Sequence, residues 1–269
     1  MAETITDRQV VAVLRPFVRA TTPMLDGLRE ANPFGIVRRV LPGDGLEKVE
    51  RGLREKLLAG LESTHVPGTA AWHAMTVDER DDWWVGRVGR FTVLLASIPG
   101  IGGALADRLP IQDTLATAGQ GLVLSALAVE HGVTDQGARV RLIAKVLFDR
   151  DIDHGLAAGA ATVAEDAAAA EMTADLEESQ RKHGKVTFKA ASGALWRFGR
   201  TLLALGDELD KRPQGRFYHK ALGAVPVVGM AGDYLGERSA LKRAAKRGRK
   251  WLDAETGVAV RETKPKKWW

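Results

Sequence analysis

Three aspartates lie beside apolar, glycine-rich turns, where a carboxyl group could act in acid–base chemistry: Asp107, Asp113 and Asp233. Burial in such a turn favours the protonated carboxyl group and suits it to a role as general acid or base. An aspartate at this kind of position more commonly caps a helix or neutralises a neighbour such as Arg108, and we favour that structural interpretation. No Gly-x-Ser-x-Gly sequence surrounds Ser97 or Ser125, so the sequence predicts no hydrolase nucleophile.

Metal and cofactor sites are not predicted either. The segment from Asp149 to Asp153 resembles the start of a calcium loop, but its glycine comes one place late, at Gly155, and its twelfth position is Ala160. The histidines show no paired ligand spacing, and His131 is expected to make a favourable contact with the C-terminal end of a helix. The glycines between residues 100 and 103 follow no predicted strand, so they do not indicate a nucleotide site.

The strongest electrostatic feature is a basic segment from Arg238 to Leu252. At about 100° per residue, seven cations fall on one half of a helix: Arg238, Lys242, Arg243, Lys246, Arg247, Arg249 and Lys250. The other half carries Ala240, Leu241, Ala244, Ala245, Gly248, Trp251 and Leu252. Such a helix can lie on an anionic membrane surface, or its apolar half can pack on the domain while its cations face water.

A second basic element ends the chain in the sequence KPKKWW, and we expect it to be disordered when free. It combines cations that attract anionic headgroups with indoles that favour a membrane interface: Lys264, Lys266, Lys267, Trp268 and Trp269. Together the two basic elements favour surface binding. The same cations could bind nucleic acid phosphates without sequence specificity, but no zinc finger, RNP motif or clear helix-turn-helix pattern accompanies them.

Composition limits the remaining possibilities. The chain has 269 residues, is 45% hydrophobic and 27% charged, and carries a net charge of +5. It has no cysteine, which excludes disulfides, thiolate metal sites and cysteine nucleophiles and fits a reducing compartment. The start of the chain does not resemble a secretory signal. The uncharged stretch at residues 91–106 is interrupted by Pro99 and is shorter than the roughly 20 residues of a membrane span.

The elements expected to position these residues are all helices. Local start, stop and periodicity signals predict helices at Asp7–Glu30 with a break near Thr21–Pro23, Leu46–Leu61, Val77–Ala96, Ile111–His131, Gln136–Phe148, 156–178, Thr187–Leu209 and from about Gly229. The prediction is an all-α, single multi-helix domain. We divide the chain into an N-terminal helical region (1–75), a helical core (76–256) and a basic tail (257–269).

Two short motifs echo each other. Ile98-Pro-Gly-Ile-Gly102 is followed by Asp107, and Val225-Pro-Val-Val-Gly229 is followed by Asp233. In each motif the proline is expected to end a helix and the glycine to allow a tight turn. We expect two helical hinges that pair in a core of small residues.

These motifs and their surroundings resemble the EcsC family. The resemblance covers "ASIPGIGGALADRLPIQDTLATAGQGLVLSALAVEHGVTDQGARVRLIAKVLF" and the later "AVPVVGMAGDYLGERSALKRAAKRGRKWL". It implies a bacterial, helical, membrane-associated or peripheral protein and brings no catalytic residues. The matching positions are structural motif positions only: Pro99, Gly102, Asp107, His131, Gly132, Pro226, Gly229 and Asp233.

The leading functional hypothesis is therefore a noncatalytic accessory or scaffold at the cytoplasmic face of a membrane. Its expected partner is an anionic membrane surface or a membrane protein. Two alternatives stay open: a hydrolase of a lipid or amphipathic substrate that uses the three aspartates named first, and a nonspecific nucleic-acid binder. No cofactor and no metal are expected, and the sequence does not predict an oligomeric state.

Overall fold

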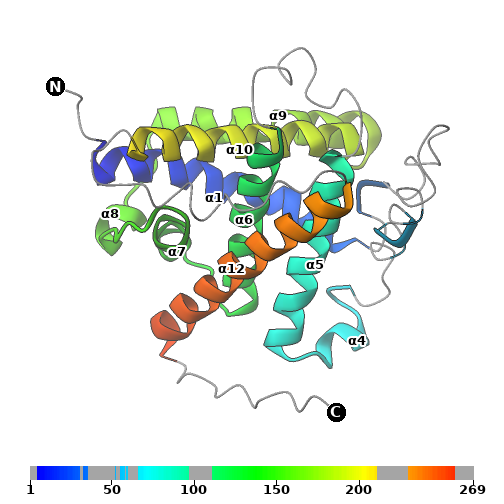
Figure 1. Cartoon of the computed structure of the whole chain (residues 1–269). Coiled ribbons are helices and arrows are strands. Elements are labelled where there is room, and N and C mark those ends of the chain that lie inside the picture. The colour runs from blue at the N-terminus through cyan, green and yellow to red at the C-terminus, as the bar shows by residue number, and fades with distance from the viewer. Residues whose placement is uncertain are drawn as a thin grey trace.

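A computed structural model describes residues 5–30, 33–35, 52, 55–57, 59, 66–96, 111–210 and 230–257. Every regular element within these ranges is a helix, which confirms the predicted all-α fold (Figure 1). The elements are α1 (Asp7–Arg29), η1 (Pro33–Gly35), α4 (Ala70–His73), α5 (Val77–Ala96), α6 (Ile111–Glu130), α7 (Gln136–Phe148), α8 (His154–Ala158), α9 (Val163–His183), α10 (Phe188–Asp210) and α12 (Met230–Thr256).

Helix α6 forms the centre of the fold. It contacts α5, α10 and α12 extensively, and α1, α9 and α10 form a layer that crosses its end (Figure 1). Every residue from Gly121 to Ala128 is buried, so this helix has no solvent-facing side along that stretch. Helix α1 contributes Leu14 and Phe17, both 0% exposed, to the same core as α6 and α10. The N-terminal region therefore shares one hydrophobic core with the rest of the described chain.

The predicted break near Thr21–Pro23 is wrong, because α1 continues through both residues to Arg29. The hydroxyl of Thr21 donates a hydrogen bond to the carbonyl oxygen of Val18 over 2.7 Å. Apolar side chains before and after the proline are buried in the core, and this packing outweighs the local preference for a break.

Most local helix signals are confirmed. Thr76 and Glu79 form the predicted capping box at the start of α5, with the Glu79 backbone nitrogen 3.3 Å from the Thr76 hydroxyl. Asp135 caps α7, and Gly132 adopts a φ of 76° in the preceding turn. The left-handed conformation at residue 132 explains the glycine there.

The helix expected over residues 156–178 is divided into α8 and α9. The helix breaks after Ala158, and the guanidinium of Arg15 lies at the break. It donates hydrogen bonds to the carbonyl oxygens of Leu156, Ala157 and Ala160. The same guanidinium lies 3.2 Å from a carboxylate oxygen of Glu165 at the start of α9. A long-range contact therefore occupies backbone carbonyl groups that a continuous helix would have used itself.

Several predicted features lie outside the described residues. They are most of the helix at 46–61, both proline–glycine hinges with Pro99, Gly102, Asp107, Pro226 and Gly229, and the tail from residue 258 onward. Among the helices that the structure describes, none is long and apolar enough to cross a membrane.

Candidate functional site

Helix α12 carries the basic segment, and its apolar half is buried. Leu241, Ala244 and Leu252 are 0% exposed, and the helix packs on α5, α6 and α7. Gly248 permits a close approach to α6, because a Cβ atom at this position would lie 2.6 Å from the Leu124 side chain. Figure 1 shows α12 lying across the α5–α6 pair. The apolar half predicted from the sequence is thus part of the protein core and is not free to enter a bilayer.

The opposite face of α12 carries five exposed cations, here named the cation ridge: Lys242, Arg243, Lys246, Arg247 and Lys250. Successive members one turn apart are separated by about 6 Å along the helix axis. Within the described part of the chain, no carboxylate lies at ion-pair distance from Lys242, Lys246 or Lys250. Like charges at this spacing repel each other, so the ridge is a favourable contact surface for an anionic partner.

Arg249 does not belong to the ridge, although the sequence placed it on the same face. Its Nε atom lies 2.8 Å from Asp81 Oδ2, and its Nη2 atom lies 2.7 Å from Asp82 Oδ1. Burial opposes the charge of Arg249, but the hydrogen bond to Asp82 and the charges of both aspartates raise its pKa overall. This arginine therefore fastens α12 to the start of α5 and is not available to an external anion.

His131 completes this buried charged cluster. Its Nε2 atom lies 3.0 Å from Asp81 Oδ2, and its Nδ1 atom lies 4.0 Å from Asp253 Oδ1 on α12. The hydrogen bond to Asp81 raises the pKa of His131, against a smaller lowering by burial. Because Asp81 is 0% exposed, its charge is compensated by His131 and Arg249 in the interior and not by solvent.

His131 was predicted to lie at the C-terminal end of this helix, and it directly follows α6, but its main partner was not predicted. Sequence reasoning expected an interaction with the helix end and missed Asp81 and Asp82. The only sequence signal for them is a run of acids in the first turns of α5, which is also what an ordinary helix start shows. Gly132 follows directly and supplies the turn.

Helix α7 also fixes the C-terminal half of α12. Arg141 pairs with Glu255, and its guanidinium lies 5.5 Å from the centroid of the Trp251 ring. This cation–π contact and the Arg249 pairs hold α12 from two sides. The ridge therefore projects from a helix whose last turns are anchored.

The candidates for catalysis and calcium binding gain no support from the described residues. Asp113 is exposed, whereas Asp107 and the side chain of Asp233 lie outside the described part. Asp149 and Asp151 pair with Lys145, and no group of three or more potential metal ligands occurs among the described side chains. Asp81 and His131 form an Asp–His pair, but the free nitrogen of the imidazole faces a third side chain, a carboxylate, rather than a hydroxyl nucleophile.

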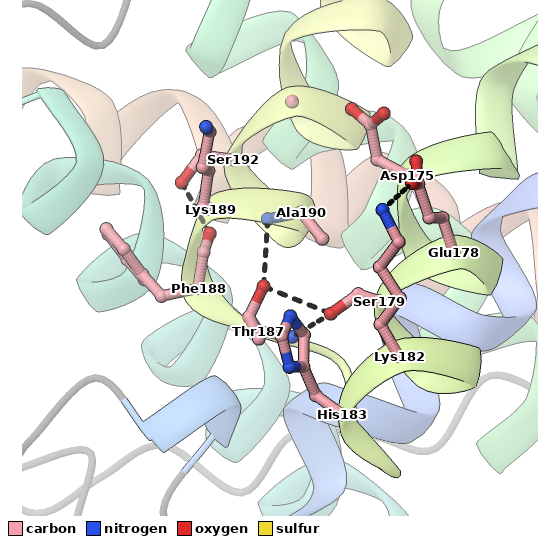
Figure 2. Close-up of a pocket in the computed structure, with 11 residues that line it drawn as sticks. Asp175, Glu178, Ser179, Lys182, His183, Thr187, Phe188, Lys189, Ala190 and Ser192 are labelled. Atoms are coloured by element: carbon pink, nitrogen blue, oxygen red, sulfur yellow. Dashed lines mark hydrogen bonds and ion pairs between the residues drawn. The ribbon is translucent and has the colours of Figure 1, made fainter.

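An open groove of about 620 Å³ lies between the end of α9 and the start of α10 (Figure 2). No sequence motif indicated this groove. Its central polar groups bond to each other, since the Ser179 and Thr187 hydroxyls lie 3.0 Å apart and Thr187 accepts a hydrogen bond from the backbone of Ala190. Lys182 pairs with Glu178 at its rim. These contacts connect two helices and leave no buried polar group directed at a ligand.

No family model, curated protein or solved structure matches this chain.

Proposed function

We propose that this protein is a noncatalytic, EcsC-like accessory or scaffold protein that binds an anionic membrane surface, at the cytoplasmic face, through the cation ridge of α12. The observation that carries the proposal is the division of α12 into an apolar face packed on the core and an exposed cationic face. The family resemblance noted in the sequence is consistent with such a role.

The packing of α12 defines the kind of contact. Because Leu241, Ala244 and Leu252 are already in the core, surface binding rests on charge and not on insertion of apolar side chains. Each cation near an anionic surface contributes on the order of 1 kcal/mol. At an ionic strength of about 0.1 M, salt screens this attraction at distances beyond about 10 Å. The tail cations Lys264, Lys266 and Lys267 with Trp268 and Trp269 would add to the same contact.

Sedimentation with vesicles tests this proposal. The full chain is mixed with phosphatidylcholine vesicles with and without phosphatidylserine, and the wild type is compared with a triple variant carrying Lys242→Gln, Lys246→Gln and Lys250→Gln. Loss of three cations is expected to weaken binding to the anionic vesicles by on the order of 100-fold. The wild type is expected to bind the neutral vesicles weakly, and its binding to anionic vesicles is expected to fall as salt rises.

A charge-matched control separates the ridge from net charge. Lys185→Gln, Lys189→Gln and Arg200→Gln remove three exposed cations outside α12. This variant is expected to bind nearly as well as the wild type. Equal losses in both variants, or wild-type binding by the ridge variant, would show that the ridge is not the contact. Binding to duplex DNA but not to anionic vesicles would instead favour the nucleic-acid alternative.

A further inference from the structure

The cluster around His131 connects α12 to the core through an imidazole whose pKa is raised by its hydrogen bond to Asp81. Charged side chains from three helices face or adjoin the imidazole. Helix α5 contributes Asp81 and, through Arg249, Asp82, and helix α12 contributes Arg249 and Asp253. Glu130 of α6 adjoins the imidazole in sequence, but its carboxylate contacts Trp84 and Arg80. Histidine is the side chain whose ordinary pKa of about 6.5 places its change of charge between about pH 5 and pH 8.

We propose that His131 is a proton-operated latch that holds the last turn of α12, beyond the cation ridge, against the end of α6 and the start of α5. When both ring nitrogens carry protons, one faces Asp81 at 3.0 Å and the other faces Asp253 at 4.0 Å. After loss of one proton, the remaining N–H stays with the buried Asp81, and a lone pair faces the carboxylate of Asp253. The attraction between the imidazole and Asp253, which is larger than the repulsion from Arg249, is then lost.

The location of the contact limits what the latch can move. Leu252 is 0% exposed and Arg249 is held by two aspartates, so the body of α12 stays in place in either state. Asp253 begins the final residues of the helix, which end at Thr256. Deprotonation of His131 therefore loosens the last turn, where the chain leaves the core toward its basic tail.

The latch would make surface binding depend on protons, and in this respect it rests on the proposed function. An anionic cytoplasmic leaflet has a surface potential near −30 mV, which raises the local proton concentration about threefold. A membrane surface would thereby favour the protonated, latched state of His131. The latched state holds in place the last turn of α12, which directly precedes the basic tail in the sequence, and this would lower the ordering cost of binding.

Amide exchange of the full chain without vesicles tests the latch alone. Protection of residues 253–256, corrected for intrinsic exchange, is measured by NMR at about pH 5.5 and about pH 8. In the wild type this protection is expected to be roughly five- to tenfold higher at the lower pH. His131→Gln and Asp253→Asn are expected to remove this difference. Glu255→Gln, which removes a carboxylate that pairs with Arg141 instead, is expected to lower protection at both values and keep the difference.

The two proposals fail separately. Equal protection at both pH values in the wild type, or an unchanged pH difference in Asp253→Asn, would overturn the latch whether or not the protein binds vesicles. Loss of the latch with normal vesicle binding would leave the ridge as the surface contact. If the latch holds, vesicle affinity of the wild type is expected to fall several-fold between about pH 6 and about pH 8, while His131→Gln shows no such change.

Discussion

Replacement of Gly199 by alanine is expected to damage the packing of α10 on the central helix. A Cβ atom at this position would lie 2.0 Å from the carbonyl oxygen of Thr114 and 2.7 Å from its carbonyl carbon. Both atoms belong to the α6 backbone, so no side-chain rotation relieves the clash. Ordinary contact begins near 3.4 Å, and the two helices would have to separate locally by about 1.4 Å, which interiors at crystal-like packing density resist.

The expected cost follows from two opposing effects. Overpacking costs about 1–3 kcal/mol, with backbone clashes at the upper end, whereas alanine in a helix is about 1 kcal/mol better than glycine. The alternative of separating the helices exposes the neighbouring Phe198 and Leu202, both 0% exposed. We expect Gly199→Ala to lose about 2 kcal/mol and to lower the Tm by about 4–8 °C.

Thermal and urea unfolding, followed by circular dichroism, measures this loss. Gly86→Ala is the matched control, because it is also a helix glycine and its nearest neighbour is the end of the Arg90 side chain at an ordinary 3.4 Å. The control is expected to be slightly more stable than the wild type. A Gly199→Ala protein as stable as the wild type would refute the close α6–α10 contact.

Two further predictions concern buried charges. Glu165→Ala leaves the guanidinium of Arg15 buried, and among the described residues its remaining partners are carbonyl groups. Unfolding in urea is therefore expected to show a loss of about 3 kcal/mol. A loss below about 0.5 kcal/mol would show that the pair contributes little. His131 has a raised pKa through Asp81, so its contribution to stability is complete below its unfolded value of about 6.5 and is lost as pH rises through the higher folded pKa. The Tm difference between the wild type and His131→Gln is accordingly expected to shrink above about pH 6.5, and a difference that grows there would contradict the sign.

Local signals predicted helices well where a few neighbouring residues decide the outcome. Helix α7 begins and ends at Gln136 and Phe148 as predicted, because Asp135 caps it and Gly132 ends the turn before it. The buried half of α12 was likewise readable from apolar spacing, since any helix with such a face must cover it. These features depend on short-range geometry, which sequence periodicity reports directly.

Sequence reasoning failed where a partner lies far away along the chain. Arg249 follows the same spacing as the ridge cations, but two aspartates at the start of α5 hold it inward. The helix break after Ala158 depends in the same way on Arg15 from α1. No local pattern distinguishes a cation that faces water from one that meets a distant carboxylate, because both occur at the edge of an apolar face.

The cations of α12 have two different roles, because Arg249 points into the protein and the ridge cations point outward. Arg249 forms ion pairs with Asp81 and Asp82, so it stabilises the position of the helix. Lys242 and Lys246 make no such pairs within the described residues, so their charges are available to a partner. A helix that inserts into lipid must expose its apolar face and is ordered by the membrane. Here the core has ordered the helix already, so the anionic partner that we propose would meet a preorganised row of cations, and selectivity would come from the charge density of that partner.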